Sequence, residues 1–436
     1  MSSPSGATKS ADAALESARA AAAAGTPETH AFLRSLLRGR HALSFTQPRE
    51  FVRDASGTRV PLRRATHADM LSAVEADAAI VAARALKTNP YREVERVFKS
   101  TATAADARAA GAIDVYAADA NGTVRGLARL REAAPDVVAA TEAAMVGEAS
   151  VEGASGALGG VYEIEHRPGS FLLPRALSAS AQAALVRASL RAYVEPPQLR
   201  NVDNAGAPGA GPTLLWDMFR AQRATSGSSV PRCTLDAVSW ATIGEHYNWT
   251  RRTYHLKSDG DAPPDWPSAA PFPPPLSALA VRVVREINAA TRAEPQLHLR
   301  PEAGIVNLYR GAAKLKQPMG GHVDDGERTL DAPVVSISVG CACVFLLGGR
   351  DANDEPIPLL LHSGDILVLS GPSRTAFHGV ARVFDGEGAP PLFNAAEPLP
   401  ATFAGGAYDP GCDAEEGDFA AWLATARINI NVRQVV

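Results

Sequence analysis

Three residues whose types suit metal binding lie in two separate segments of the chain. His322 and Asp324 form an HxD pair, and the isolated His378 follows in TAFHGVARVF. In an extended strand the side chains at i and i+2 point to the same side, so this imidazole and carboxylate can face one ion. Two histidines and one carboxylate without a nearby cysteine form the ligand set of a non-haem Fe(II) centre, whose open coordination positions imply chemistry at the metal. The alternative is that these histidines are satisfied within the core, which is the commoner fate of an isolated HxD pair.

The terminal segment RININVR, residues 427–433, alternates polar and aliphatic side chains. In a strand its aliphatic residues face one way and its polar residues the other; the polar set is Arg427, Asn429, Asn431 and Arg433. A polar face of this kind is either the solvated edge of a sheet or an anion site, because guanidinium groups match carboxylate geometry and keep their charge. A metal centre that uses a keto acid needs a cation for the distant carboxylate, which this face can supply.

Asn307 and Tyr309 repeat the two-residue spacing in IVNLYR, where Val306 and Leu308 point to the opposite side. Their amide N–H and phenol O–H can donate to the same ligand as the terminal strand. A cross-strand polar pair without any ligand is the alternative interpretation.

The composition is that of a globular protein and makes several classes of function less plausible. The chain of 436 residues is 46% hydrophobic and carries a formal net charge of −4, so a nucleic acid would have to bind a local basic patch. The four cysteines include no CxxC pair and no secreted disulfide framework. We therefore expect a reducing, intracellular environment, with nucleus, cytoplasm and mitochondrion left open. No hydrophobic run approaches the roughly 20 residues that span a bilayer, so no membrane partner is expected, and no obligate protein partner is evident.

The predicted elements change type along the chain. Residues 1–160 are rich in alanine and favour helices, notably over 67–90 and 128–147, so we expect a helical extension that is partly disordered at its start. A Gly-rich linker is expected over 151–160, and an amphipathic helix over 276–292.

From residue 303 onward, short β-branched runs separated by turn residues predict an antiparallel barrel or jelly roll. Residues 385–426 are rich in Pro, Gly and acidic residues and predict a surface insertion before the last strand. The expected fold class is therefore α+β.

Taken in order, these motifs resemble the AlkB family of Fe(II)- and 2-oxoglutarate-dependent dioxygenases. The motifs are NLY at 307–309, HVD at 322–324, PVVSISVG, LHSGDILVLSGPSR, His378 and RxNxxxR at 427–433. VFLLGG, the terminal NVRQVV and IGEHYNW at 243–249 are similar, more narrowly, to the AlkB homologue 1 subgroup. The resemblance implies a double-stranded β-helix, a jelly roll with backing helices, in a dioxygenase domain over residues 161–436. It does not extend to a role for the N-terminal extension.

The resemblance also implies a role for each motif residue. His322, Asp324 and His378 would bind Fe(II), with 2-oxoglutarate and O2 as co-substrates. Arg427 would pair with the distal carboxylate of 2-oxoglutarate, supported by Asn307 and Tyr309. Asn429, Asn431 and Arg433 would line the near end, with Arg433 orienting Asp324. Arg374 either contacts the co-substrate or holds its own loop.

The implied activity is oxidative demethylation of N-methylated bases in tRNA or DNA, with release of formaldehyde, succinate and CO2. Aromatic and basic side chains in GEHYNWTRRTYHLK are candidates for base stacking and phosphate contact, namely Tyr247, Trp249, Arg251 and Arg252. Core aromatics and a solvated cationic surface are the alternative interpretation of the same segment. A protein or small-molecule hydroxylase on the same iron scaffold is the alternative function, and the sequence does not rank RNA against DNA.

Overall fold

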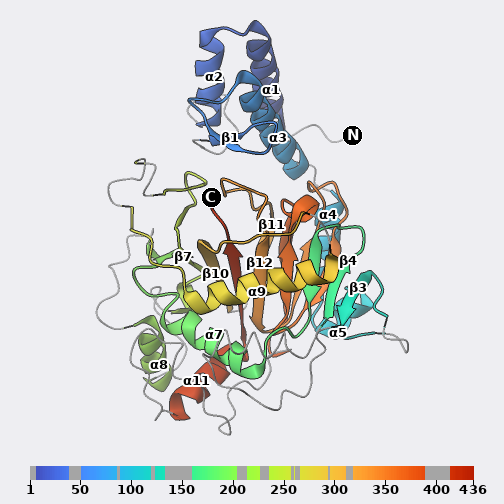
Figure 1. Ribbon diagram of the computed structural model, residues 1–436, viewed down its shortest axis with the longest axis vertical. Helices are drawn as coiled ribbons and strands as arrows, with labels where there is room; N and C mark the ends of the chain where they lie inside the picture. The colour runs from blue at the N-terminus through green and yellow to red at the C-terminus, as the bar shows by residue number, and fades with distance from the viewer. Residues whose placement is uncertain are drawn as a thin grey trace.

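The computed structural model describes most of the chain, as helices packed on two antiparallel sheets (Figure 1). The described residues are 6–38, 51–85, 89–118, 123–132, 160–203, 214–225, 235–256, 260, 266–292, 295–310, 318–387 and 413–436. None of the described helices is both long and apolar enough to cross a membrane.

The larger described sheet has nine strands, paired antiparallel throughout. In spatial order they are β3 (Leu127–Glu132), β4 (Gly160–Ile164), β5 (Ser170–Leu173), β15 (Ile366–Leu369), β12 (Val334–Gly340), β17 (Ala426–Arg433), β10 (Ala303–Arg310), β7 (Trp240–Gly244) and β6 (Leu199–Arg200). The terminal strand β17 thus lies inside the sheet, between β12 and β10, and not at an edge.

The smaller described sheet has four antiparallel strands and carries both histidines of the predicted metal site. Its order is β11 (Met319–His322), β16 (His378–Val383), β13 (Cys343–Leu347) and β14 (Ile357–Leu361). Apolar side chains from both sheets meet in one core cluster, which includes Tyr309, Phe345, Leu367 and Val380. The two sheets therefore face each other, and the predicted site lies between them.

Helices cover the other face of the larger sheet, where α9 crosses the strands with α7 below it (Figure 1). These helices are α7 (Ala179–Arg191), α8 (Leu215–Thr225), α9 (Pro274–Thr291) and α11 (Asp413–Leu423). Their apolar residues share a core with Ile428, Ile430 and Val432, all of which are fully buried. The side chains of RININVR therefore alternate between two faces, as predicted. The aliphatic side chains face the helices, and the polar side chains face the smaller sheet.

Two short helices cover the outer side of the smaller sheet. They are α4 (Pro90–Lys99), which contains the segment YREVERVF, and α5 (Ala104–Ala109). Tyr91 and Phe98 of α4 are buried in a cluster with Val344 and Leu346 of β13. Residues 90–109 thus pack directly on the sheet that holds the histidines.

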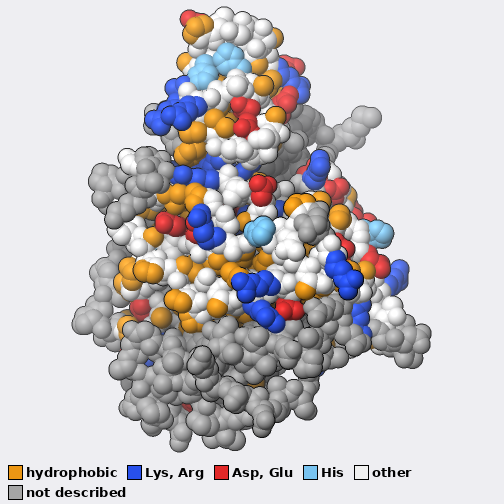
Figure 2. Space-filling model, viewed as in Figure 1, with side chains coloured by type: hydrophobic (Ala, Val, Ile, Leu, Met, Phe, Trp, Pro, Cys, Tyr) orange, Lys and Arg blue, Asp and Glu red, His pale blue; other side chains and the backbone are white. Residues whose placement is uncertain are grey.

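Residues 6–38 and 51–85 form a separate N-terminal lobe above the sheets (Figure 1). Helices α1 (Gly6–Ala24), α2 (Pro27–Leu37) and α3 (His67–Ala85) surround a small core with Val52 of the hairpin β1 (Phe51–Arg53) and β2 (Arg59–Pro61). Lys and Arg side chains lie where this lobe meets the rest of the molecule (Figure 2).

The structure differs from the sequence prediction in two segments. Residues 128–132 belong to strand β3 and not to a helix, because they pair with β4. The second half of the predicted surface insertion, residues 413–423, forms α11, whose Phe419 and Trp422 are almost fully buried. The linker at 151–159, the stretch 133–150 and the first part of the insertion, 388–412, lie outside the described residues. The helix predicted over 67–90 is present as α3 up to Ala85, whereas Pro90 already begins α4 and residues 86–88 lie outside the described residues. The helix predicted over 276–292 is present as α9.

The central position of β17 makes its buried aliphatic residues important for stability. We predict that Ile430→Ala lowers the free energy of unfolding by about 2–5 kcal/mol, because the substitution leaves a cavity in a close-packed core. Val97→Ala is the matched control, since Val97 is 49% exposed and its truncation should change stability by less than about 0.5 kcal/mol. Urea denaturation followed by circular dichroism measures both, and equal losses would contradict the placement of β17.

Candidate metal centre

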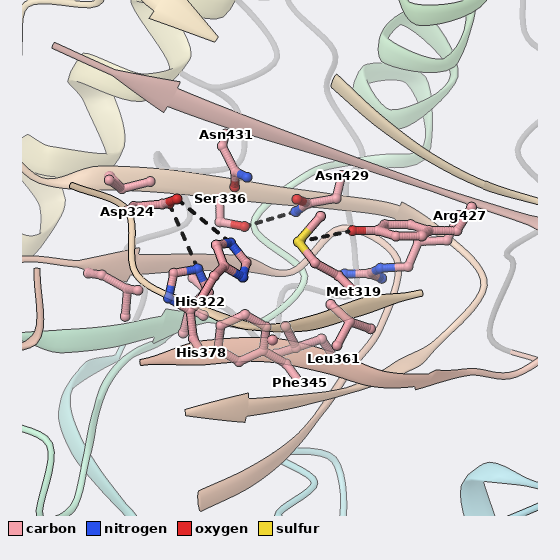
Figure 3. Close-up of a pocket in the computed structure, with 16 residues that line it drawn as sticks. Met319, His322, Asp324, Ser336, Phe345, Leu361, His378, Arg427, Asn429 and Asn431 are labelled. Atoms are coloured by element: carbon pink, nitrogen blue, oxygen red, sulfur yellow. Dashed lines mark hydrogen bonds and ion pairs between the residues drawn. The ribbon is translucent and has the colours of Figure 1, made fainter. Parts of the chain in front are cut away.

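His322, Asp324 and His378 come together at one end of a pocket between the two sheets (Figure 3). One possible ligand atom from each residue lies within 4.8 Å of the others. Nε2 of His322 is 3.7 Å from Oδ1 of Asp324, and Nε2 of His378 is 3.8 Å from Oδ2. Strand pairing explains the meeting, because His322 at the end of β11 is opposite His378 at the start of β16.

Backbone carbonyls orient both imidazole rings. Nδ1 of His322 lies 2.9 Å from the carbonyl oxygen of Gly320, and Nδ1 of His378 lies 2.8 Å from that of Ala376. Each Nδ1–H can therefore donate a hydrogen bond to a carbonyl. In that tautomer the lone pair of Nε2 is directed at the cluster, as a metal ligand requires. Burial, reinforced by the neighbouring His322, lowers the pKa of His378 to about 4. The ring is then neutral and available to a metal ion near neutral pH.

Asp324 is held as an ionised carboxylate by Arg433. Burial by itself would raise the pKa of Asp324, but the positive charge of Arg433 and the nearby imidazoles bring it well below its usual range. Nη2 of Arg433 donates to Oδ2 of Asp324 over 2.7 Å. Two imidazoles and one carboxylate without thiolates fit Fe(II), and this donor set would occupy only three of its coordination positions.

Behind Asp324 lies a buried ion network that was missing from the sequence analysis. Glu327 is fully buried, and its two oxygens accept from Arg433 over 3.0 Å and from Arg374 over 2.9 Å. Burial would raise the pKa of Glu327, but these two guanidinium groups lower it. Arg374 also donates to the backbone carbonyl of Asp324 over 2.8 Å. Arg374 therefore holds the loop that carries Asp324, which is neither its own loop nor a contact to the co-substrate.

The segment DDGERTL gives little indication of this network, because three acidic residues around a glycine are typical of a solvated turn. The need for a further carboxylate becomes evident only once the burial of the arginines is known. Arg374 and Arg433 are both almost fully buried, and two buried cations need more carboxylate charge than Asp324 alone supplies.

Arg427 occupies the opposite end of the same pocket (Figure 3). It is 1% exposed, and its guanidinium donates to the Ser338 hydroxyl over 2.7 Å and to the Cys341 carbonyl over 3.2 Å. Its Nε has no hydrogen-bond partner, and none of the described carboxylates pairs with it. Because a buried cation is costly without a counter-ion, this end of the pocket suits the carboxylate of a bound ligand such as 2-oxoglutarate.

Polar side chains connect the two ends. Register places Asn307 opposite Asn429 and Tyr309 opposite Arg427, and Asn307 donates to Asn429 over 3.4 Å. Burial raises the pKa of Tyr309, so its phenol remains protonated and can donate. Tyr309, Asn429 and Asn431 line the pocket together with Arg427 and the metal cluster. Asn307 and Arg433 are not among the described residues that line this pocket; they contact it indirectly, Asn307 through Asn429 and Arg433 through Asp324.

The four residues predicted to contact substrate are placed differently from one another. Trp249 is 44% exposed and Arg251 is exposed. Tyr247 is buried, with its ring 4.8 Å from that of Trp249, and Arg252 pairs with Asp325 at 3.0 Å. None of the four is among the described residues that line the pocket of Figure 3.

The buried network predicts a large effect from a single neutralising change. Glu327→Gln should lower the free energy of unfolding by about 3–5 kcal/mol, because it removes the charge that Arg374 and Arg433 share. Asp331→Asn is the control, since Asp331 is an exposed carboxylate on the following turn and its loss should matter by less than about 0.5 kcal/mol. Denaturant titrations compare the two, and an equally small effect of both would contradict the network.

Comparison with known proteins identifies this architecture. Residues 213–433, just over half of the chain, match the model of the 2OG-Fe(II) oxygenase superfamily. The chain is 29% identical over 298 residues to the DNA N(6)-methyladenine demethylase ALKBH1A of Arabidopsis thaliana, covering 63% of this chain and 77% of that protein. It is 33% identical over 283 residues to the human nucleic acid dioxygenase ALKBH1, covering 63% and 66%.

A third relative is the tRNA demethylase abh1 of Schizosaccharomyces pombe, 28% identical over 286 residues, which cover 63% of this chain and 82% of that protein. The aligned family region contains the metal cluster, Arg427 and Arg433. The chain therefore belongs to the AlkB family of the 2OG-Fe(II) oxygenase superfamily, in its ALKBH1 subgroup, and is an Fe(II)- and 2-oxoglutarate-dependent dioxygenase.

Proposed function

We propose that this protein is an oxidative demethylase of N-methylated bases in nucleic acid, either tRNA or DNA. The observation that carries the chemistry is the pocket itself, in which a His-Asp-His cluster faces a buried arginine that no described carboxylate neutralises. The substrate class rests on the relatives, which are named for demethylation of DNA and tRNA and for dioxygenase action on nucleic acid.

In this proposal His322, Asp324 and His378 hold the metal, and Arg427 binds the distal carboxylate of 2-oxoglutarate with support from Asn307 and Tyr309. Asn429 and Asn431 line the pocket. Arg433, which is not among the described lining residues, acts from behind Asp324, where it keeps the carboxylate ionised and fixes Oδ2. When bound, Fe(II) with 2-oxoglutarate and O2 supplies the oxidation that removes the methyl group as formaldehyde, with succinate and CO2 as the other products. Apolar side chains of Phe345 and Leu361 form the opposite wall and limit the access of water.

The finer architecture is part of the same proposal. The two facing antiparallel sheets are interpreted as a double-stranded β-helix, or jelly roll, in a dioxygenase domain over residues 161–436 with an insertion at 385–426. Residues 1–160 are an N-terminal extension, of which α4 and α5 pack on the smaller sheet. We further propose an intracellular location and action without an obligate protein partner, on the composition alone.

Trp249 and Arg251 are the surface residues best placed to meet a nucleic acid. An exposed indole can stack on a base, and an adjacent guanidinium can contact phosphate. Tyr247 supports Trp249 from below through its edge-to-face contact, and Arg252 is engaged with Asp325.

The proposal is tested by turnover on methylated nucleic acid. Incubation with Fe(II), 2-oxoglutarate and tRNA or DNA oligonucleotides that carry N-methylated bases should give succinate and loss of the methyl group, both detected by mass spectrometry. His378→Ala and Asp324→Ala should abolish both signals because each removes a metal ligand. His298→Ala, which truncates an exposed histidine, should retain them. Hydroxylation of peptides or small molecules without any demethylation would favour the alternative hydroxylase, and an active His378→Ala variant would contradict the metal assignment.

A second prediction concerns the co-substrate. Arg427→Met should weaken 2-oxoglutarate binding by roughly 2–5 kcal/mol, because it removes one partner of a buried charge pair. The measurement is calorimetric titration of 2-oxoglutarate into the Mn(II)-loaded protein, supported by succinate formation at increasing 2-oxoglutarate concentration. Arg350→Met, at an exposed position, is the matched control. Equal affinities for the two variants would exclude Arg427 as the carboxylate partner.

A further inference from the structure

Two arginines of the N-terminal lobe reach the loop that carries the metal carboxylate. Arg53 ends β1 and Arg59 begins β2, and the two residues are opposite each other in the register of this hairpin. Both side chains extend from the lobe toward residues 325–327, immediately after Asp324. A role for this lobe is not supplied by the family region, which begins at residue 213.

The contacts go to backbone oxygens and not to acidic side chains. Nη2 of Arg53 donates to the carbonyl of Asp325 over 3.0 Å and to that of Glu327 over 2.6 Å. Nη1 of Arg59 donates to the carbonyl of Gly326 over 2.5 Å. Because they bind the main chain, these guanidinium groups fix the path of the loop itself.

Together with Arg374, the two lobe arginines engage every carbonyl of the loop. Arg374 donates to the carbonyl of Asp324 over 2.8 Å, so four consecutive carbonyls, from residue 324 to residue 327, accept from guanidinium groups. The side chains at both ends, Asp324 and Glu327, are bound by Arg433. Little freedom remains for the metal carboxylate relative to the strands that hold the histidines.

An aromatic ring also packs against this loop. A Cβ placed on Gly326 would lie 2.4 Å from Cε2 of Tyr247, so the backbone approaches this ring closely. Arg59 also donates to the Thr253 hydroxyl in the hairpin of β8 (Tyr247–Asn248) and β9 (Thr253–Tyr254). The lobe hairpin therefore binds both the loop and the element that supports it.

The lobe arginines are half-buried in these contacts. Burial lowers the pKa of Arg59 to about 10 and lowers that of Arg53, although Asp325 and Glu327 oppose the shift at Arg53. Arg59 is further covered by the Phe51 ring, at 4.1 Å from its centroid. Desolvated guanidinium groups that bind carbonyls form strong, directional hydrogen bonds. This geometry is more specific than the attachment of one lobe to another requires.

We propose that Arg53 and Arg59 are positioning residues of the metal centre, through which the N-terminal lobe orders residues 324–327 and so raises the affinity of the site for its metal ion. This inference rests on the proposed role of Asp324 as a metal ligand. None of the described lobe residues lines the pocket of the metal cluster; the lobe acts through the backbone that carries the carboxylate.

The experiment uses the full-length chain and two measurements that need no turnover. The variant is Arg53→Met/Arg59→Met, and the matched control is Arg63→Met/Arg64→Met, which removes two exposed arginines next to the same hairpin. Hydrogen–deuterium exchange of metal-free protein reports the order of the peptide that covers residues 324–328. Titration with Mn(II), followed by its electron paramagnetic resonance signal, reports the metal affinity.

We expect the loop peptide of Arg53→Met/Arg59→Met to exchange faster than in the wild type, and the Mn(II) dissociation constant to rise about 10-fold or more, as is usual when support of a metal ligand is lost. The control variant should match the wild type in both. Arg53→Lys/Arg59→Lys should lie between, because an ammonium keeps the positive charge but lacks the planar, fixed donor geometry of a guanidinium. This variant also provides the test if the methionine variant does not fold.

An unchanged Mn(II) affinity, within twofold of the wild type, overturns the inference even if exchange is faster, because the lobe would then only dock on the loop. Asp324→Ala separates this failure from that of the proposed function. Loss of Mn(II) binding in Asp324→Ala with normal binding in the lobe variant removes the inference alone. Normal Mn(II) binding in Asp324→Ala would remove the ligand assignment on which both depend.

Discussion

The metal centre depends on a buried network of ion pairs between two carboxylates and two guanidinium groups. Asp324 and Glu327 are removed from water, and each is compensated by Arg433, with Arg374 completing the pairing at Glu327. An isolated buried carboxylate would take up a proton and lose its value as a metal ligand. Because Glu327 also binds Arg433, the guanidinium is held in place before any metal binds. The hydrogen bond from Arg433 then fixes Oδ2 of Asp324.

The terminal strand carries two buried arginines whose surroundings differ. Arg427 and Arg433 lie six residues apart on β17, about 20 Å in an extended strand, and both are buried. Arg433 is neutralised by carboxylates that the chain supplies, whereas no described carboxylate pairs with Arg427. The difference in their counter-ions, and not in their own chemistry, supports the proposal that Arg433 holds a metal-binding carboxylate while Arg427 binds an anionic co-substrate.

Local sequence patterns predicted the parts of the site that local geometry determines. The two-residue period of strands placed the polar residues of β10 and β17 on one face, and antiparallel register then set Tyr309 opposite Arg427. Glu327, Arg53 and Arg59 were missed because their roles depend on contacts with distant parts of the chain, 272 and 274 residues away for Arg53. Helix α11 was missed for a related reason, since its burial follows from packing on α7 and β17 and not from its acidic composition.

The loop after Asp324 shows why such distant support matters for a centre with only three protein ligands. A flexible loop would have to be ordered when the metal binds, and the lost conformational entropy, about 1–2 kcal/mol for each backbone residue, would reduce the affinity. Here the loop is ordered by arginines that approach from the terminal strand, the turn between β15 and β16, and the N-terminal lobe. The entropy is thus lost during folding, when the burial of large apolar surfaces offsets it. A metal site of few ligands can then bind its ion with a geometry that already exists.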